Sequence, residues 1–289
     1  MMNRRTFLGQ AGAFSAGMFF LPKLASAKPL TPKYGLQLYS LRDQLPKDVK
    51  GVIQKVAEAG YKQVETFGYS KENGFWGLNV TDFKALLKTN GLISPSGHYG
   101  IDSFLSTGDP KDLNTAIETA TTLGQEYIVI PYIGADLRKT ADDLKKLVNA
   151  INVAANTVQK AGLKIAYHNH DFEFEEIGGQ MLFNLLVTET NPDLVDIEMD
   201  VYWVVRAGHD PLEYLQGHPE RFKLIHVKDM DKDDPKLNTE IGTGSIDFKH
   251  ILAAARKDDV KYYYVEQENY KMDAYASIAK SNANLRTLL

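Results

Sequence analysis

Two histidines and four carboxylates are concentrated in one short stretch of the chain, KIAYHNHDFEFEE at residues 164–176. The stretch begins with mostly apolar residues, as in a buried strand, and His168 and His170 follow at a spacing of two. Side chains alternate between the two faces of a strand, so both imidazoles share one face if the strand continues through them. Imidazole and carboxylate groups together are ligands that divalent metals accept in proteins. The stretch therefore indicates a metal site at the end of a strand.

Polar side chains also follow the other apolar runs of the chain. They are Gln37, Glu65, His98, Glu198, Asp200, His226, Lys228, Glu266 and Glu268. Burying so many ionisable groups without partners costs on the order of several kcal/mol for each group. A divalent cation removes this conflict, because it pairs with carboxylates and neutral imidazoles at the same time.

A repeating pattern of elements positions these residues. A short apolar run followed by a helical pattern occurs eight times, and the runs cover residues 34–40, 61–67, 92–99, 126–132, 163–170, 193–200, 222–229 and 261–268. Alternating strands and helices favour a parallel sheet, and eight units close a (β/α)8 barrel. The alternative is an open doubly wound sheet, but no glycine-rich phosphate loop follows the first run. We therefore predict an α/β fold, a single-domain TIM barrel with its active site at the carboxyl ends of the strands.

The first residues have the features of an export signal. Arg4 and Arg5 precede an apolar, glycine-containing stretch that ends in Ala-Ser-Ala at residues 25–27. This pattern resembles a twin-arginine signal peptide, which predicts a signal at residues 1–27, a barrel domain at residues 28–289 and a periplasmic location. The alternative is a short surface-bound helix. The apolar stretch is too short for a membrane span, so no stable membrane anchor is expected.

Composition excludes several other classes of protein. The 289 residues carry a formal net charge of −4, which argues against nucleic acid as the main partner. The chain contains no cysteine, so disulfides, thiolate catalysis, zinc–thiolate sites and a lipoprotein anchor are excluded.

Four segments carry a resemblance to a known family. They are LQLYSLRD, MDVYWVVRAGHDP, LIHVKD and VEQE, which begin at residues 36, 199, 224 and 265. From about residue 33 onward the chain resembles the sugar phosphate isomerase/epimerase superfamily, the xylose isomerase-like TIM barrels that also include family 2 AP endonucleases. The resemblance implies one divalent metal ion (manganese, cobalt, magnesium or zinc) held by a glutamate, an aspartate, a histidine and a second glutamate.

The last three of these ligands have counterparts in this chain, and the first does not. Asp200, His226 and Glu266 match the aspartate, the histidine and the second glutamate, while His168 stands where the family has its first glutamate. The resemblance therefore implies a metal site of these four residues. His170 and Glu173 remain alternatives to His168.

The function implied is that of a metal-dependent isomerase or epimerase of a sugar or keto-sugar, working through an enediolate. Family epimerases exchange a proton between two metal-bound glutamates, of which only Glu266 remains here. His170 is the candidate for the second proton-transfer group, because the pKa of imidazole lies near neutrality. One base and a different acid also suit β-elimination, so a 3-keto-glycoside lyase or hydratase is the alternative. A third hypothesis is an exported sugar-binding protein without catalysis.

The remaining strand-end residues are candidates for contact with a carbohydrate substrate. They are Gln37, Glu65, His98, Trp203 and Lys228, of which Trp203 can stack on a sugar ring. Structural alternatives are a helix cap or ion pair for Glu65, a loop hydrogen bond for His98 and a solvated strand end for Lys228. Glu198 is expected to orient a ligand. The segment IGTGS at residues 241–245 is read as a loop turn in preference to a phosphate contact.

The resemblance also bears on partners. Family endonucleases use three metals and more histidines than this chain places, which argues against DNA repair. Dimers and tetramers are common among relatives, so a homo-oligomer is compatible with the resemblance.

Overall fold

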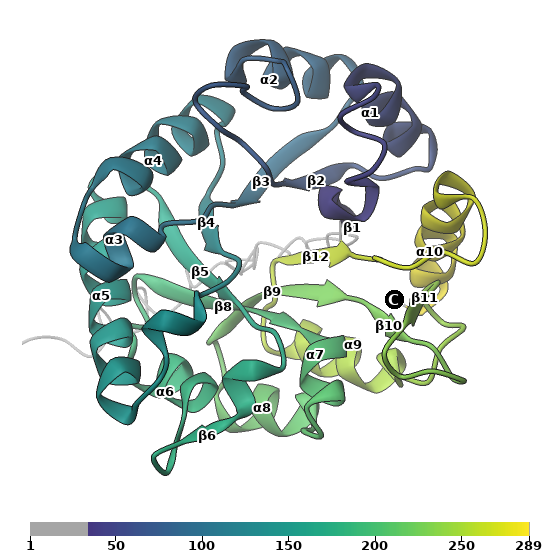
Figure 1. The fold of residues 1–289 in the computed structure, drawn as a ribbon. Helices are drawn as coiled ribbons and strands as arrows, with labels where there is room; N and C mark the ends of the chain where they lie inside the picture. Colours follow the sequence, from purple (N-terminus) through teal and green to yellow (C-terminus); the bar gives the residue numbers. More distant parts are fainter. Residues whose placement is uncertain (1–33, 289) are drawn as a thin grey trace, which may run out of the picture. The chain divides into compact units, whose positions relative to one another are not determined.

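The barrel of this protein is closed by eight parallel strands, seen in a computed structural model that describes residues 34–288 (Figure 1). The predicted signal peptide, residues 1–27, and the start of the predicted domain lie outside the described residues. The strands pair in the order β1-β12-β9-β8-β5-β4-β3-β2. They are β1 (Tyr34–Gln37), β2 (Gln63–Thr66), β3 (Ile93–His98), β4 (Tyr127–Ile130), β5 (Lys164–His168), β8 (Val195–Asp200), β9 (Phe222–Val227) and β12 (Tyr262–Val265). The prediction of a single TIM barrel is confirmed.

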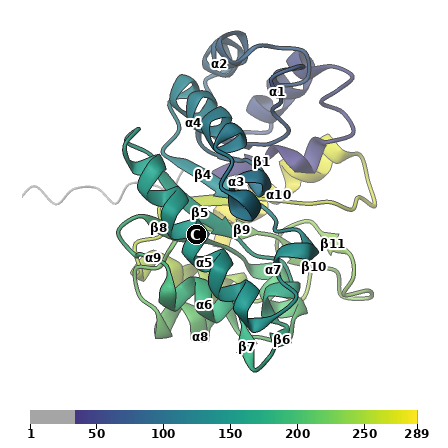
Figure 2. The same cartoon turned by 60° about the vertical axis from the view of Figure 1, so that its left-hand side comes forward.

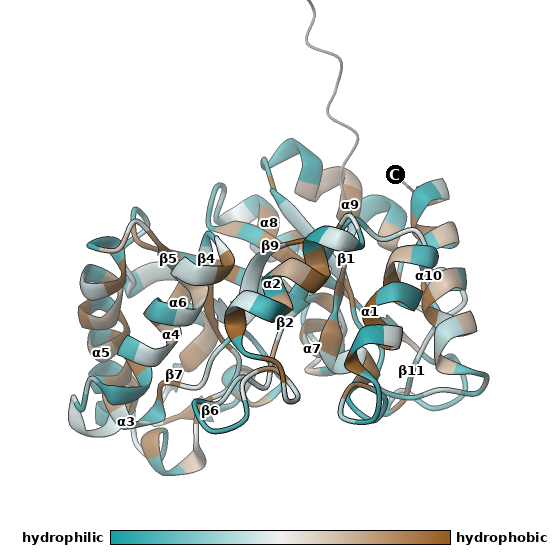
Figure 3. Ribbon diagram, turned by 90° about the horizontal axis from the view of Figure 1, so that it is seen from above, coloured by the Kyte–Doolittle hydropathy of each residue, from teal (hydrophilic) through white to brown (hydrophobic). Residues whose placement is uncertain are grey.

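Helices follow the strands and cover the outside of the barrel (Figure 2). They are α1 (Val49–Glu58), α2 (Val80–Thr89), α3 (Asp102–Thr107), α4 (Lys111–Leu123), α5 (Ala141–Gln159), α6 (Leu182–Glu189), α7 (Val201–Arg206), α8 (Pro211–Gly217), α9 (Phe248–Lys257) and α10 (Ala274–Leu288). Several begin at a side-chain cap, and the longest, α5, begins at a capping box in which Thr140 and Asp143 exchange hydrogen bonds. Figure 3 shows apolar and polar residues mixed along the helices, as expected when one face packs on the strands.

Shorter elements are inserted in the connections. Two-stranded hairpins join β6 (Glu176–Ile177) to β7 (Gln180–Met181) and β10 (Asp229–Met230) to β11 (Asn238–Thr239). The 3₁₀ turns are η1 (Leu38–Leu41), η2 (Ala135–Leu137) and η3 (Phe172–Phe174). None of the helices in the described part of the chain is both long enough and apolar enough to span a membrane.

Strand register brings the polar residues of the sequence together. Neighbouring strands pair Gln37 with Glu65 and His168 with Glu198. Asp200 of β8 pairs with His226 of β9. The last residues of parallel strands thus share one edge of the barrel, where this architecture carries its active sites.

Below that edge the barrel is filled by side chains from the strands. Tyr127, Val129, Ala166, Leu224 and Tyr264 form a small buried cluster separate from the main core. A Cβ on Gly35 would lie 2.3 Å from the Tyr264 ring, so this strand position requires glycine. The packed interior forms a floor, and the polar residues lie above it.

Candidate active site

The four residues predicted to hold a metal ion lie together at the carboxyl edge of the barrel. One ligand atom from each of His168, Asp200, His226 and Glu266 lies within 4.8 Å of the others. All four side chains are buried. His226 Nδ1 is 2.9 Å from Glu266 Oε2, and His168 Nε2 is 4.0 Å from Asp200 Oδ2. We call these four residues the ligand set.

The donors of the ligand set fit a divalent cation. Two imidazoles and two carboxylates suit manganese, cobalt or zinc. Asp200 Oδ2 is buried without a hydrogen-bond partner, and burial raises the pKa of this carboxyl to about 7 despite the nearby charge of Lys228. Burial, together with His226, lowers the pKa of His168 well below its usual value, which keeps this imidazole neutral, as a metal ligand must be.

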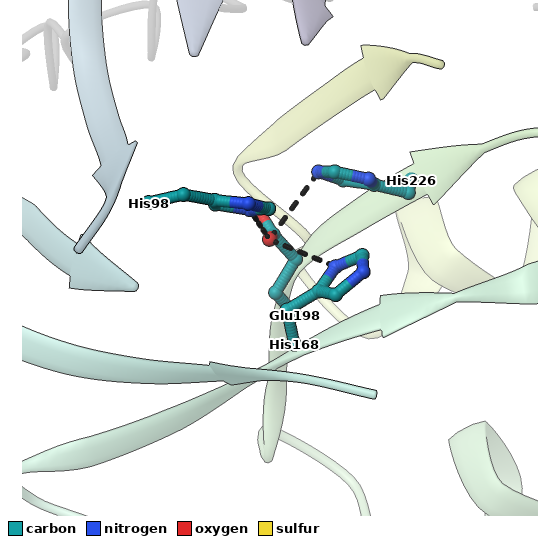
Figure 4. A group of neighbouring side chains, drawn as sticks. All are labelled: His98, His168, Glu198 and His226. Carbon is teal, nitrogen blue, oxygen red and sulfur yellow. Dashed lines mark hydrogen bonds and ion pairs between the residues drawn. The ribbon is translucent and has the colours of Figure 1, made fainter. Parts of the chain in front are cut away.

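A second cluster lies beside the ligand set and shares two histidines with it. In Figure 4, three histidines converge on one oxygen of Glu198. Its Oε2 is 2.9 Å from His98 Nε2 and 3.2 Å from both His168 Nδ1 and His226 Nε2. Glu65 Oε2 lies 2.7 Å from His226 Nε2 and 3.0 Å from His98 Nε2, and it accepts a hydrogen bond from Gln37 Nε2.

The two ring nitrogens of each shared histidine face different clusters. His226 presents Nδ1 to Glu266 and Nε2 to Glu65, while His168 presents Nε2 to Asp200 and Nδ1 to Glu198. A neutral imidazole has one N–H and one lone pair. If the lone pairs face a cation in the ligand set, both N–H groups point at carboxylates. This is the usual arrangement behind metal-bound histidines.

Charge is shared across the second cluster. Burial and the charge of Glu65 raise the pKa of Glu198, but the charge of His226 and hydrogen bonds from His168 and His226 outweigh them and hold it at about 2. Burial lowers the pKa of His98, but Glu65 and Glu198 raise it to about 9. The carboxylates therefore stay ionised and accept hydrogen bonds. Glu65 and Gln37, predicted as substrate contacts, belong to this network and do not line the cavity described below.

His170 lies beyond the end of its strand. Because β5 ends at His168, strand alternation does not place His170, yet its ring centroid is 5.1 Å from that of His168 and 5.3 Å from that of Trp203. Burial and the charge of Lys228 lower the pKa of His170 to about 3, so the expectation of a pKa near neutrality was wrong and this imidazole is uncharged at neutral pH. Glu173 belongs to neither cluster, because its two oxygens accept hydrogen bonds from the Tyr167 hydroxyl and the His170 backbone N–H, each at 2.8 Å.

Lys228 is buried among carboxylates and does not lie in solvent. Its Nζ is 3.7 Å from Asp200 Oδ2 and 3.5 Å from Glu266 Oε2, and it forms an ion pair with Glu268. Burial lowers the pKa of Lys228, but Glu266 and Asp200 raise it above the usual range, so the ammonium remains charged. The same Nζ lies 5.1 Å from the centroid of the Trp203 ring.

These groups open into one cavity of about 700 Å³. His98, His168, His170, Trp203, Lys228, Glu266 and Glu268 line one part of it. Trp203 Nε1 is buried and has no hydrogen-bond partner within the described residues. The cavity thus offers a sugar an aromatic ring, an ammonium group and imidazoles beside the ligand set.

Comparison with known proteins decides the family. Residues 53–288 match the family model described as xylose isomerase-like TIM barrel. The chain belongs to this family. The family resemblance read from the sequence is thereby confirmed, and three of its four segments, which contain Asp200, His226 and Glu266, lie within the matched residues.

Three relatives show how this xylose isomerase-like barrel compares with known proteins. A sugar phosphate isomerase/epimerase from Parabacteroides distasonis is 30% identical, with a TM-score of 0.76 over 91% of this chain and 96% of that one. An inosose dehydratase from Geobacillus kaustophilus is 24% identical over 79% of this chain and 84% of its own. A D-allulose 3-epimerase from Methylomonas sp. shares the fold, with 16% identity and a TM-score of 0.70 over 90% of this chain and 99% of that one.

Loop residues of this family member were missed by sequence reasoning. Tyr39, Tyr69 and Tyr132 line the cavity, and the only signal for them is an aromatic residue at or just after the end of an apolar run. The reading of IGTGS as a loop turn agrees with its hydrogen bonds. The backbone N–H groups of Gly242, Gly244 and Ile246 all donate to the Asp229 carboxylate, which leaves these amides no free donor for a phosphate.

Proposed function

We propose that the protein is a metal-dependent lyase that removes a leaving group from a keto-sugar by β-elimination. The observation that carries this proposal is the presence of His168 in the ligand set. The family resemblance implies a glutamate at this position, which in epimerases is one of the two that exchange a proton. Of the two glutamate positions that the resemblance implies, only the one at Glu266 is still a carboxylate. The resemblance to inosose dehydratase, whose name denotes loss of water, supports the same class of reaction.

The side chains around the ligand set divide the work of an elimination. When bound by the ligand set, a divalent metal supplies a positive charge that stabilises a substrate carbonyl as it becomes negative. His170 Nδ1 is buried without a partner, which leaves it free to accept a proton from the carbon next to that carbonyl. Lys228 adds a fixed positive charge, and Trp203 offers a face for the sugar ring.

A second candidate is a sugar isomerase or epimerase on the same residues. It is favoured by the 30% identity to a sugar phosphate isomerase/epimerase over most of both chains. Glu266 and His170 would then take a proton from one carbon and return it to the same or the neighbouring carbon. The two candidates share the first proton transfer and differ in whether a C–O bond breaks.

Proton NMR in D2O separates these reactions. The Zn²⁺-loaded protein is given a panel of sugars, 3-keto-sugars and 3-keto-glycosides. New vinylic protons or a released alcohol support the lyase. Deuterium uptake with recovery of sugar isomers supports the isomerase and contradicts the lyase. If sugars of the panel bind but none reacts, the result supports a sugar-binding protein without catalysis.

The variant Glu266→Gln tests the role of this carboxylate. If the protein is the isomerase, in which Glu266 is one of two proton-transfer groups, turnover should fall by about a hundredfold or more, because such a group typically contributes at least that factor. Metal binding should weaken only modestly, since an amide oxygen remains as a ligand and three other ligands are unchanged. Near-normal turnover in this variant would remove Glu266 from the mechanism.

A further inference from the structure

The cavity extends well beyond the ligand set. Its outer part is lined by the loop after β2 and by α3 and α4, through Tyr69, Lys71, Glu72, Ser103, Lys111 and Thr115. The whole cavity measures about 700 Å³, within the range of about 300–1,000 Å³ that encloses a drug-sized ligand. Such a ligand is larger than one sugar ring. A single ring beside the ligand set therefore leaves the outer part unfilled.

Two of the aromatic rings that line the cavity are exposed to solvent. Tyr39 is 38% exposed and Tyr132 is 48% exposed, and they are two of only five large hydrophobic side chains this exposed within residues 34–288. Tyr132 lies near the ligand set, 5.8 Å from the His170 ring, whereas Tyr39 lies beside the loop after β2 and thus at the outer part. Tyr39 packs edge-on against Phe67 at 5.1 Å, and Phe67 packs against Trp76 at 5.2 Å. Rings held in this way offer a ready surface on which a second ring can stack.

Charges at the outer part are balanced. Lys71 and Lys111 are matched by Glu72 and Asp112 among the lining residues, and Lys71 also lies 3.8 Å from Glu118. Phosphate sites concentrate positive charge, and this part of the cavity does not. It offers both donors and acceptors, which is what the hydroxyl groups of an uncharged sugar require.

We infer that the substrate is a glycoside, with a keto-sugar ring at the ligand set and a second, uncharged sugar ring in the outer part of the cavity. This inference rests on the proposed lyase function and names its leaving group. If the second ring is attached through the anomeric oxygen, elimination must remove the proton from C2, and the carbonyl must stand at C3.

Atoms and electrons balance within the site. The C2–H electron pair becomes the C1=C2 double bond, and the C1–O pair leaves with the oxygen of the second ring. His170 receives the C2 proton and can pass it to that oxygen, so no oxidant or further reactant is needed. The products are a free sugar and an unsaturated 3-keto-sugar.

Substrates that differ only in the second ring test this inference. Methyl 3-keto-glucoside carries the reacting ring alone, whereas the 3-keto derivatives of trehalose and cellobiose add a glucose ring through an α and a β linkage. We expect kcat/KM for one of the two disaccharides to exceed that for the methyl glycoside by at least about tenfold, the contribution of one or two stacked rings. Equal values for all three would overturn the inference while leaving the lyase proposal intact.

A pair of variants at Tyr39 tests the stacking surface. Tyr39→Ala should reduce by about tenfold the ratio of kcat/KM for the preferred disaccharide to kcat/KM for the methyl glycoside. Tyr39→Phe, which keeps the ring, should preserve this ratio. Met272→Ala is the control, because Met272 is 45% exposed but lies outside the cavity. An unchanged ratio in Tyr39→Ala would contradict a role for this surface.

Binding measurements test the two-ring site separately from the lyase activity. If no substrate is turned over, the lyase proposal fails, and calorimetry with unoxidised cellobiose, trehalose and methyl glucoside then tests the outer part alone. Tighter binding of a disaccharide, weakened by Tyr39→Ala, supports the two-ring site. Equal binding of all three overturns it.

Discussion

At the scale of residues, the site depends on carboxylates that stand behind the ligand histidines. Glu198 Oε2 lies within 3.2 Å of a nitrogen of each of three histidines, and two of these belong to the ligand set. A carboxylate in this position fixes which ring nitrogen carries the proton and how each ring is turned. We therefore expect metal affinity to depend on a residue that does not need to touch the metal.

Replacing Glu198 tests this dependence. Glu198→Gln should weaken binding of Mn²⁺ or Zn²⁺ about tenfold to a hundredfold, because an amide cannot accept from several N–H groups with the strength of a carboxylate. Competition with a chelator measures the affinity, and circular dichroism checks the fold. Glu175→Gln is the control, since Glu175 is an exposed carboxylate on the loop after β5. Equal affinity in wild type and Glu198→Gln would contradict this role.

Glu173 gives a prediction about pH. Burial raises the pKa of this carboxyl from 4.5 to about 8, although hydrogen bonds from Tyr167 and the His170 backbone lower it. Between these values the folded protein binds more protons than the unfolded chain, so stability falls as pH rises from about 4.5 to about 8. Glu173→Gln lacks this slope. In thermal unfolding from pH 5 to pH 9, the Tm of Glu173→Gln should rise relative to that of the wild type as pH rises. The Tm of Glu175→Gln should follow that of the wild type.

That the residues of the ligand set lie together was predictable from the sequence, but the position of Glu173 was not. Asp200, His226 and Glu266 lie within one residue of a strand end, in segments that resemble the family, so spacing and resemblance agree on their placement. Glu173 lies on η3, a single turn that directs its carboxylate back toward Tyr167. Such a turn depends on local packing and leaves no periodic pattern in the sequence.

At the scale of elements, all eight strands appear where apolar runs predicted them. Parallel strands covered on both faces are apolar throughout, so their positions can be read directly from the sequence. Their ends are harder to read, because β5 stops at His168 where a run to His170 was expected. The helix α4 was expected from the helical pattern after the third run, but the loop after β2 and the short helix α3, which also shape the outer part of the cavity, follow no pattern that a strand or helix period reveals.

The capping box of α5 provides a prediction at this scale. Thr140→Ala should lower the free energy of unfolding by about 1 kcal/mol, because the N–H of Asp143 loses the hydroxyl that accepts its hydrogen bond. Denaturant unfolding measures the change. Turnover should not change, since Thr140 is absent from both the ligand set and the lining of the cavity. Thr140→Ser, which keeps a hydroxyl, should retain most of the stability.

At the scale of the whole molecule, fold, family and a buried polar site were foreseeable, and the size of the cavity was not. Repetition of one strand–helix unit fixes the architecture, because few arrangements accommodate eight such units. The cavity is the space left between side chains of loops far apart in the chain, such as those carrying Tyr39 and Lys111. No pattern in the sequence predicts the volume of such a cavity.

At the same scale, we propose that the chain is exported and that the arginine pair directs this export. Changing Arg4 and Arg5 together to lysine should retain the protein in the cytoplasm of a bacterium with a twin-arginine pathway. Fractionation of cells and immunoblotting measure the distribution. Unchanged appearance of the protein in the periplasm would contradict this proposal.

The hydrogen bonds of Asp229 also bear on whether the loop at residues 241–246 can bind a phosphate group. Its carboxylate receives three backbone N–H groups from the loop that begins at Ile241. A tethered group competes at an effective concentration that reaches the millimolar range for short connections. The chain therefore occupies these backbone donors with its own carboxylate, and a phosphate group could bind this loop only by displacing a competitor that is covalently attached to it.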